Sequence, residues 1–371
     1  MEISKILREY NRKNLNIATI GSHSALDVCD GASEEGIKTI IFAQKGREKP
    51  YMYYKKTKIR NYKRGCVDEI LLLDKFKDML NFREDLIKSN VIIVPNRALT
   101  SYISIDEVEN FEVPVFGNRY MLRMEERTEK ENYYSLLEKA DLPYPKKIES
   151  PEGIDKLCMI KLPHAKKRLE RGFFTVASYK EYAEKSEKRI KQGIITKEDL
   201  EKAQIEEYII GPVFNLNFFY SPFFGLELLG ADYRFESGLD GHVRLPAKQQ
   251  LTLAGTQEYP EYTVCGHANA TLRESLLEKT FVIGEKFVDA SKKFYNPGII
   301  GPFCLQTCVD KDLNFFIYDV APRIGGGTNI HMNVGAPYGN TMWRKPMSTG
   351  RRIAVEIKYA AETDELEKVV T

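Results

Sequence analysis

Gln306 and Asp319 are the residues whose types and spacing first indicate chemistry, because both carry oxygen atoms that can bind a cation. Two runs rich in β-branched and aromatic residues, 303–309 and 313–320, flank the polar trio 310–312, and this pattern predicts a β-hairpin. A hairpin brings Gln306 and Asp319 close together. Since Mg²⁺ needs only one or two protein groups where phosphates supply the rest, the pair is a candidate metal site.

The residues that follow this hairpin suit an anionic ligand. Arg323 adds a planar cation that can bind phosphate or carboxylate. Gly325, Gly326 and Gly327 let the backbone approach a ligand closely. An ordinary hairpin with a glycine-rich turn explains the same pattern, so both interpretations stay open on this segment alone.

The composition is that of a globular protein. The chain has 371 residues, 43% apolar and 29% charged, a length that allows two or three domains. A net charge of +2 argues against a dedicated nucleic-acid binder and leaves small anionic ligands open. No apolar run is long enough to cross a bilayer, so we expect neither a nucleic-acid nor a membrane partner.

The cysteines indicate a reducing compartment. They are scattered along the chain, and the first residues lack the pattern of a signal peptide, so we expect a cytoplasmic protein without a disulfide framework. Cys304 and Cys308 are four residues apart, but no second pair completes a zinc site. We interpret these two as buried apolar residues.

The first third of the chain alternates between strand and helix patterns. Strands are predicted over 15–20, 39–43, 69–73 and 91–94, with a helix over 25–35. This βαβ rhythm predicts a small parallel sheet whose ligand groups gather beyond the carboxyl ends of the strands.

The segment GSHSAL, residues 21–26, lies at such an edge and carries His23 and Ser24. Free backbone amides and the helix dipole at the start of a helix favour an anion, for which phosphate is the natural candidate. The alternative is that Ser22 or Ser24 only caps the helix and that His23 lies on the surface.

A new domain is predicted to begin after a helical stretch over 121–140 and an extended, proline-containing linker over 142–148. Lys161 lies on a predicted strand and is followed by the strongly basic loop 164–171, which suits a polyphosphate. Because runs of charge are more often solvated surface, the basic loop alone does not decide this. A helix is predicted over 179–192.

The remainder of the chain is rich in strands. Arg234 and Glu236 lie among interleaved charges next to a strand, which mark either a site or a rim of surface ion pairs. A long amphipathic helix is predicted over 272–293, and it leads back to the hairpin.

The order of these motifs resembles the ATP-grasp superfamily. Within it, the chain is similar over nearly its whole length to the archaeal formate-dependent ligases of purine synthesis, the 5-formaminoimidazole-4-carboxamide ribonucleotide (FAICAR) synthetases. The resemblance rests on GSHSAL, VPVFGNR, RESLL, GPFCLQ, the GGTN run and STGRRIA.

The resemblance implies a mixed α/β and α+β fold. It implies a preATP-grasp βαβ domain at 1–122, a small ATP-grasp subdomain with its linker at 123–210, and a large C-terminal subdomain at 211–371. The two ATP-grasp subdomains would hold a nucleotide between them. A symmetric homo-oligomer is also implied.

The resemblance also assigns roles to single residues. Gln306 and Asp319 would bind Mg²⁺ or Mn²⁺, and Lys161 and Arg323 would be the catalytic cations. The nucleotide-binding residues would be Lys146, Lys161, Glu206, Glu207, Tyr208, Ile209 and Glu236. The residues around the second substrate would be His23, Ser24, Ala98, His267 and Asn329.

The implied reaction is an ADP-forming C–N ligation. Its substrates are ATP, formate and 5-aminoimidazole-4-carboxamide ribonucleotide (AICAR). Formate is a poor acyl donor because oxide is a poor leaving group, so ATP would first convert it to formyl phosphate, which the amine then attacks. Such a reaction needs alignment and charge neutralisation and no nucleophilic serine or cysteine.

Three positions depart from the family pattern. The family has a glycine-rich loop where this chain has the basic loop 164–171, a serine where it has Ala98, and an asparagine where it has His267. Two alternatives to the formate ligase therefore stay open. One is a divergent paralogue acting on another phosphorylated amine, and the other is a non-catalytic nucleotide-binding protein.

Overall fold

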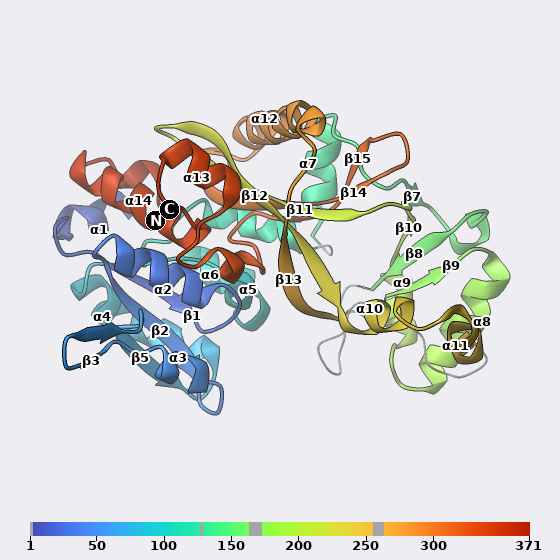
Figure 1. Ribbon diagram of the computed structural model, residues 1–371, viewed down its shortest axis with the longest axis horizontal. Helices are drawn as coiled ribbons and strands as arrows, with labels where there is room; N and C mark the ends of the chain where they lie inside the picture. The colour runs from blue at the N-terminus through green and yellow to red at the C-terminus, as the bar shows by residue number, and fades with distance from the viewer. Residues whose placement is uncertain (1–2, 127–128, 163–172, 255–262) are drawn as a thin grey trace.

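The computed structural model describes residues 3–126, 129–162, 173–254 and 263–371. β1 (Asn16–Ile20) and β2 (Lys38–Gln44), joined by α2 (Ala25–Glu34), begin a parallel sheet of order β5-β2-β1-β6 at one end of the molecule (Figure 1). β5 (Glu69–Leu73) and β6 (Val91–Ile93) complete it. The βαβ pattern expected from the sequence is confirmed, and the central strands are buried on both faces, as parallel strands usually are.

Short elements surround this N-terminal sheet. They are α1 (Ile3–Glu9), α3 (Lys49–Tyr53), β3 (Thr57–Ile59), β4 (Tyr62–Arg64), α4 (Arg83–Lys88), α5 (Arg97–Tyr102) and α6 (Ile105–Asn110). Instead of one helix over 121–140, the chain forms a 3₁₀ helix (Arg119–Glu125) and α7 (Tyr133–Lys139). The predicted helix is interrupted because Asn132 starts a new one. Its side chain caps α7 by accepting a hydrogen bond from the backbone N–H of Tyr134.

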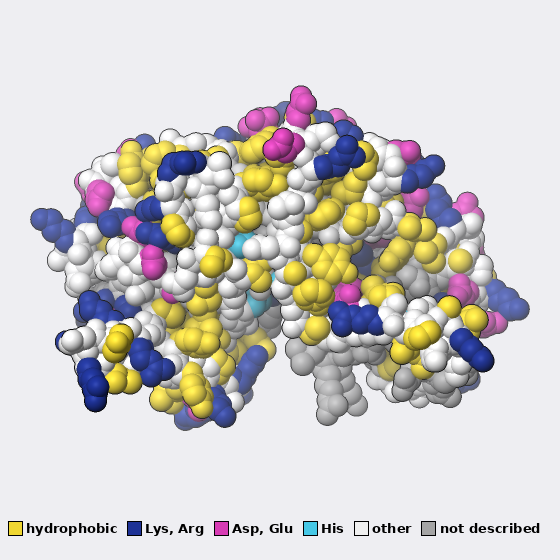
Figure 2. Space-filling view, viewed as in Figure 1, with side chains coloured by type: hydrophobic (Ala, Val, Ile, Leu, Met, Phe, Trp, Pro, Cys, Tyr) yellow, Lys and Arg dark blue, Asp and Glu magenta, His cyan; other side chains and the backbone are white. Residues whose placement is uncertain are grey.

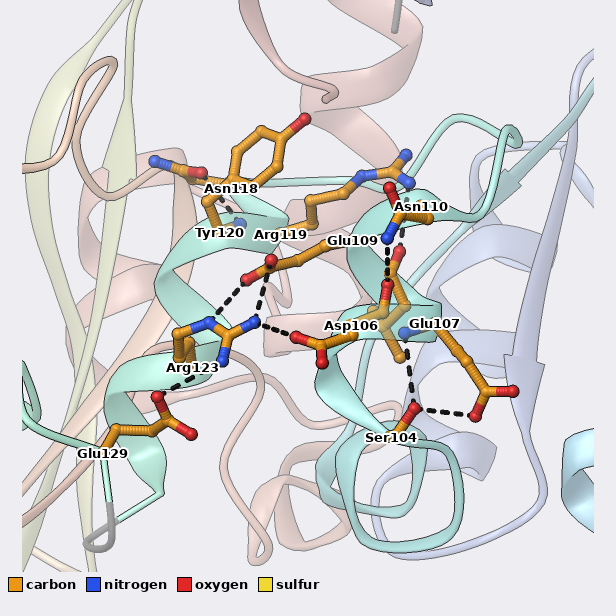
Figure 3. Close-up of polar contacts among 11 residues, drawn as sticks. Ser104, Asp106, Glu107, Glu109, Asn110, Asn118, Arg119, Tyr120, Arg123 and Glu129 are labelled. Atoms are coloured by element: carbon orange, nitrogen blue, oxygen red, sulfur yellow. Dashed lines mark hydrogen bonds and ion pairs between the residues drawn. The ribbon is translucent and has the colours of Figure 1, made fainter.

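Arg123 anchors this 3₁₀ helix to α6 (Figure 3). Its Nε donates to Glu109 Oε1 at 3.1 Å, its Nη1 reaches Glu129 Oε2 at 3.2 Å, and it also pairs with Asp106. These carboxylates raise the pKa of Arg123. The helix ends at Glu125, which pairs with Arg323.

A small antiparallel sheet of order β7-β10-β8-β9 lies at the opposite end from the N-terminal sheet (Figure 1). Lys161 ends β8, as expected, and Thr196 caps α9 through a reciprocal pair of hydrogen bonds with Asp199. The basic loop 164–171 lies outside the described residues. The elements are β7 (Lys147–Ile148), β8 (Cys158–Lys161), β9 (Phe174–Val176), α8 (Tyr179–Lys191), α9 (Lys197–Glu201) and β10 (Gln204–Glu207).

The large central sheet is antiparallel with the order β13-β12-β11-β14-β15. The predicted hairpin is β14 and β15, and Gln306 stands opposite Asp319 in its register. The strands are β11 (Val213–Ser221), β12 (Gly225–Glu236), β13 (Val264–Ala270), β14 (Gly301–Val309) and β15 (Phe315–Ala321). The helices of this part are α10 (Ser237–Val243), α11 (Ala247–Ala254), α12 (Leu277–Phe294), α13 (Pro337–Trp343) and α14 (Thr349–Glu362).

One face of the large sheet packs against α7 and α12 in an apolar core. Phe218, Phe287 and Phe303 form a stack in this core, with neighbouring ring centroids 5.2 Å apart. Each such side chain contributes about 1.5–3 kcal/mol by leaving water. The other face carries polar groups as well as Phe219, which packs in a second apolar core with residues of the N-terminal part.

The end of the chain returns to the N-terminal sheet, and the two termini lie close together (Figure 1). α14 packs on α2 so closely that a Cβ on Gly31 would lie 2.0 Å from the backbone nitrogen of Arg351. The buried Arg352 joins α14 to the large sheet through Glu227 at 2.9 Å and pairs with Glu356 at 2.8 Å.

The domain boundaries expected from the sequence, at 1–122, 123–210 and 211–371, stay a prediction.

Two sequence expectations concern disulfides and membranes. Cysteines 29, 66, 158, 265, 304 and 308 are all free thiols, and all but Cys265 are buried. Cys304 and Cys308 lie in the core, as expected. Within the described residues, no helix combines the length and apolar character needed to span a membrane.

Candidate active site

The polar face of the large sheet gathers groups from all five strands. Because side chains alternate between the two faces of a strand, residues two apart share a face. Leu216 and Phe218 point into the apolar core, so the residues between and before them point the other way. This face carries Asn215 and Asn217 on β11, Asp232 and Arg234 on β12, His267 on β13, Gln306 on β14 and Asp319 on β15.

Arg234 connects several of these groups. Its Nη1 donates to Gln306 Oε1 at 2.8 Å, its Nη2 donates to the Tyr318 hydroxyl at 3.0 Å, and it pairs with Glu236 at 3.1 Å. The sequence indicated Arg234 and Glu236 only as a site or a surface rim. The structure places both side chains largely inside the molecule, at 16% and 12% exposure, so they are not surface ion pairs.

The chemistry of Gln306 and Asp319 fits a hard cation, since one carboxylate and one amide oxygen stand side by side. Among the described residues no group of three or more His, Cys, Asp or Glu could hold a metal alone. A metal here would therefore rely on phosphate oxygens of a substrate. The Gln306 amide oxygen accepts the hydrogen bond from Arg234, so Arg234 and a metal would compete for it. The metal site stays a prediction.

Lys161 lies where the small sheet meets the large one. Its Nζ is 2.6 Å from Glu206 Oε2, 2.9 Å from the carbonyl oxygen of Tyr318 and 3.2 Å from the hydroxyl of Tyr134, which itself donates to Glu206. Lys161 is 6% exposed and Glu206 1%. A buried lysine with a paired carboxylate is held in one position, which suits a group that must meet a phosphate.

The other residues assigned to the nucleotide lie on either side of Lys161. Glu207 pairs with Lys156 at 3.3 Å, and its backbone N–H donates to the carbonyl oxygen of Lys146 at 2.9 Å. The side chain of Lys146 is exposed, and Tyr208 and Ile209 are half-buried just after β10. The structure thus brings these residues to one junction between the two sheets.

His23 and Ser24 lie at the carboxyl edge of the N-terminal sheet, next to the glycine run. Ser24 has a left-handed backbone (φ 63°) and makes no side-chain cap, and its hydroxyl donates to the carbonyl oxygen of Gly325 at 2.5 Å. The alternative that Ser24 caps α2 through its side chain is therefore wrong. The contact ties the N-terminal sheet to the segment after β15.

The electrostatic environment of His23 keeps its imidazole neutral. Burial, together with the charges of Arg323, His267 and Arg97, lowers the pKa of His23 to about 3. Its Nδ1 is buried and has no hydrogen-bond partner among the described residues. A neutral imidazole with an unpaired buried nitrogen is suited to bind a polar ligand.

Arg323 lies beside His23 and is positioned by Glu125, whose Oε1 is 2.5 Å from Nη2. Its Nη1 donates to the carbonyl oxygen of Ile324 at 2.7 Å, and its Nε is buried without a partner among the described residues. Asn329 accepts a hydrogen bond from the backbone of Asp27 at 3.2 Å. Ala98 is 3% exposed and packs in the apolar core of the N-terminal sheet.

Histidine side chains are visible at the centre of the molecule, between the N-terminal part and the large sheet (Figure 2). Among the histidines, His267 is bound to Asp232, with Nδ1 at 2.6 Å from Oδ2. Gly327 allows this approach, because a Cβ on it would lie 2.5 Å from His267 Nδ1. His267 and His23 are thus near enough to influence one another electrostatically.

Sequence reasoning missed several residues of this centre. Glu125 and Tyr134 carried no signal, because each meets its partner only through the fold. A signal existed for Asp232 and for Asn215 with Asn217, since polar residues at alternate positions of otherwise apolar strands indicate one polar face. The roles of all these residues stay predictions.

Two family models match the chain. One, described as a domain of unknown function (DUF1297), matches residues 181–371, and the other, described as a protein of unknown function (DUF1246), matches residues 17–148. Proteins called 5-formaminoimidazole-4-carboxamide-1-(beta)-D-ribofuranosyl 5'-monophosphate synthetase are similar over the full length. That of Methanocaldococcus jannaschii is 41% identical over 100% of this chain and 99% of its own. That of Methanothermobacter thermautotrophicus is 40% identical over 100% of this chain and 98% of its own.

Solved structures agree with this relationship. The crystal structure of the IMP biosynthesis protein PurP from Thermococcus kodakaraensis has a TM-score of 0.72 and 30% identity, over 96% of this chain and 100% of that one. An ADP complex of the N5-carboxyaminoimidazole ribonucleotide synthetase purK has a TM-score of 0.60 at 11% identity, over 90% of this chain and 78% of that one, which shows the shared fold alone. The fold class and the family inferred from the sequence are both confirmed. The chain belongs to the family of the 5-formaminoimidazole-4-carboxamide ribonucleotide synthetases, which have the ATP-grasp fold.

Proposed function

We propose that the protein is an ATP- and formate-dependent ligase that formylates AICAR to FAICAR in purine (IMP) biosynthesis. The observation that carries the proposal is the full-length similarity, at about two residues in five, to synthetases named for this formamino product. The solved relative from Thermococcus kodakaraensis is likewise named as a protein of IMP biosynthesis. The buried cations Lys161 and Arg323, each paired with a carboxylate, fit a reaction between phosphorylated substrates.

ATP is the proposed nucleotide, and its place is the junction between the small and large sheets. Two solved structures with the same fold are complexes with ADP or MgADP. Lys161 and Lys146 would face the phosphates, and Glu236 would lie near the nucleotide. The hinge after β10, residues 206–209, would bind adenine and ribose. Gln306 and Asp319 would hold Mg²⁺, which, when bound, neutralises charge on the phosphates.

The residues of the chain would neutralise charge, orient AICAR and exclude water. Lys161 and Arg323 offset the negative charge that builds up as the γ-phosphoryl group moves to formate and forms formyl phosphate. His23, which stays neutral, and Asn329 would orient AICAR at the carboxyl edge of the N-terminal sheet. Exclusion of water from this centre would protect the acyl phosphate from hydrolysis.

The full-length relationship does not favour the alternatives raised by the sequence, a paralogue acting on another phosphorylated amine or a non-catalytic nucleotide-binding protein. A homo-oligomeric assembly and a cytoplasmic location stay predictions.

The test is a coupled assay of ADP release by the purified protein with ATP, Mg²⁺ and AICAR, with and without formate. We expect ADP release and a formylated product only when formate and AICAR are both present. ADP release that is independent of formate, without formylated product, would contradict the proposal. Binding of ATP without any release of ADP would instead support a nucleotide-binding protein.

A further inference from the structure

His267 belongs to a buried hydrogen-bonded network that determines which of its nitrogens carries a proton. Asp232 is 1% exposed and accepts hydrogen bonds from Asn215 Nδ2 at 2.7 Å and Asn217 Nδ2 at 2.6 Å. His267 Nδ1 lies 2.6 Å from Asp232 Oδ2. A carboxylate that takes three such contacts is an acceptor, so Nδ1 of His267 is the donor. Nε2 is then left with its lone pair.

Nε2 of His267 lies near the glycine run that follows β15. A Cβ added to Gly326 would be 3.7 Å from His267 Nε2 and 4.0 Å from His23 Cγ, so both imidazoles lie close to this glycine. The His267 side chain is 14% exposed. Nε2 has no hydrogen-bond partner among the described residues. A base that is oriented by a carboxylate and open on its other nitrogen has the arrangement of a catalytic histidine.

The geometry points to His267 as a general base for formyl transfer, with Asp232 as the positioning residue. The inference rests on the proposed function. The amino nitrogen of AICAR is conjugated with its ring and is a weak nucleophile. As it attacks formyl phosphate, the C–N bond forms, the C–O bond breaks, and phosphate leaves with the electron pair. The proton lost by the nitrogen passes to Nε2 of His267 and then to solvent.

The charged and titratable groups around His267 determine how a pH profile is read. Asp232 and Arg234 face it from β12, and His23 faces it from the turn before α2. Arg323 acts on the same His23, and His331 lies near Asp232. Burial keeps both His23 and His331 neutral above about pH 4, so neither produces an acidic limb near neutrality.

The test measures ADP and formylated AICAR separately, with the full-length protein from about pH 5.5 to 9. For the wild type we expect product formation to fall on the acid side. For His267→Asn we expect kcat for product to fall about 10²–10³-fold with loss of that limb, as for removal of a general base. In His267→Asn the KM for AICAR should change less than about threefold, and ADP release should exceed product formation. In His267→Ala, added imidazole should restore part of the rate. His242→Asn, on α10, is the matched control and should resemble the wild type.

The outcomes separate the two proposals. If the wild type makes no formylated product with formate, the proposed function fails and the general base fails with it. If the wild type is active and His267→Asn keeps its rate and pH profile, only the general base is overturned. A wild-type profile without an acidic limb overturns it as well, even if the variants do not fold.

Discussion

Arg323 Nη2 lies 2.5 Å from Glu125 Oε1, although the two residues are 198 positions apart in the chain. Both side chains are less than one tenth exposed. Arg323 follows β15, whereas Glu125 ends the 3₁₀ helix that Arg123 ties to α6 (Figure 3). The position of a proposed catalytic cation is therefore determined by a segment that belongs to neither strand of its hairpin.

Removing Glu125 should destabilise the protein, because Glu125→Ala leaves the Arg323 charge buried and unpaired. We expect a loss of about 3 kcal/mol, the lower end for breaking a buried pair. Thermal or urea unfolding measures it. Glu112→Ala, which breaks an ion pair with Arg83 at 41% and 50% exposure, is the control and should cost less than about 1 kcal/mol. Equal losses in the two variants would contradict the buried pair.

Lys161→Met should weaken catalysis with ATP. We expect kcat/KM for ATP to fall about 10²-fold or more, because the cation that we propose faces the phosphates is lost. The single variant also leaves the buried Glu206 carboxylate without a counter-charge, so part of its effect is structural. The double variant Lys161→Met, Glu206→Gln should recover the melting temperature without recovering turnover. Recovery of both would mean that Lys161 serves only the fold.

Asp319→Asn should reduce turnover more than nucleotide binding. An amide is a weaker ligand for Mg²⁺ than a carboxylate, so we expect turnover to fall about 10²-fold or more and to need more Mg²⁺. Turnover is measured over a range of Mg²⁺ concentrations, and ATP binding by calorimetry. Asp312→Asn, in the exposed hairpin turn, is the control. A normal Mg²⁺ dependence in Asp319→Asn would remove Asp319 from the metal site.

His23 and His331 should make the protein less stable in acid. Burial and the Arg323 charge lower the pKa of His23 to about 3, and burial lowers the pKa of His331 to about 4. In the unfolded chain a histidine titrates near about 6.5. Between about pH 4 and 6.5 the unfolded chain therefore binds more protons than the folded one, and stability falls as pH falls through this window.

The melting temperature of the wild type should accordingly drop from pH 7 to pH 5. His331→Asn removes one of the two titrations, so its drop should be smaller. His242→Asn changes a histidine that is not fully buried and should show the wild-type drop. If His331→Asn loses as much stability as the wild type over this range, His331 is not held neutral in the folded protein.

Local patterns were enough to predict much of the fold. The βαβ start, the hairpin that places Gln306 opposite Asp319 and the strand carrying Lys161 all follow from short-range rules of alternation. The stretch over 121–140 was the exception. Its charged residues suit one continuous helix, but Asn132 caps the separate helix α7 and Arg123 forms an ion pair with Glu109 on α6.

The sequence by itself determined the family, the types of ligand groups and the strands and turns that carry them, because these depend on neighbouring residues. Only the tertiary structure decided which buried groups meet. Lys161 with Glu206, Arg323 with Glu125 and His267 with Asp232 join segments far apart in the chain. Spacing along the chain does not encode such pairs, because a buried charge is stabilised by whichever partner the packing of separate sheets brings within reach.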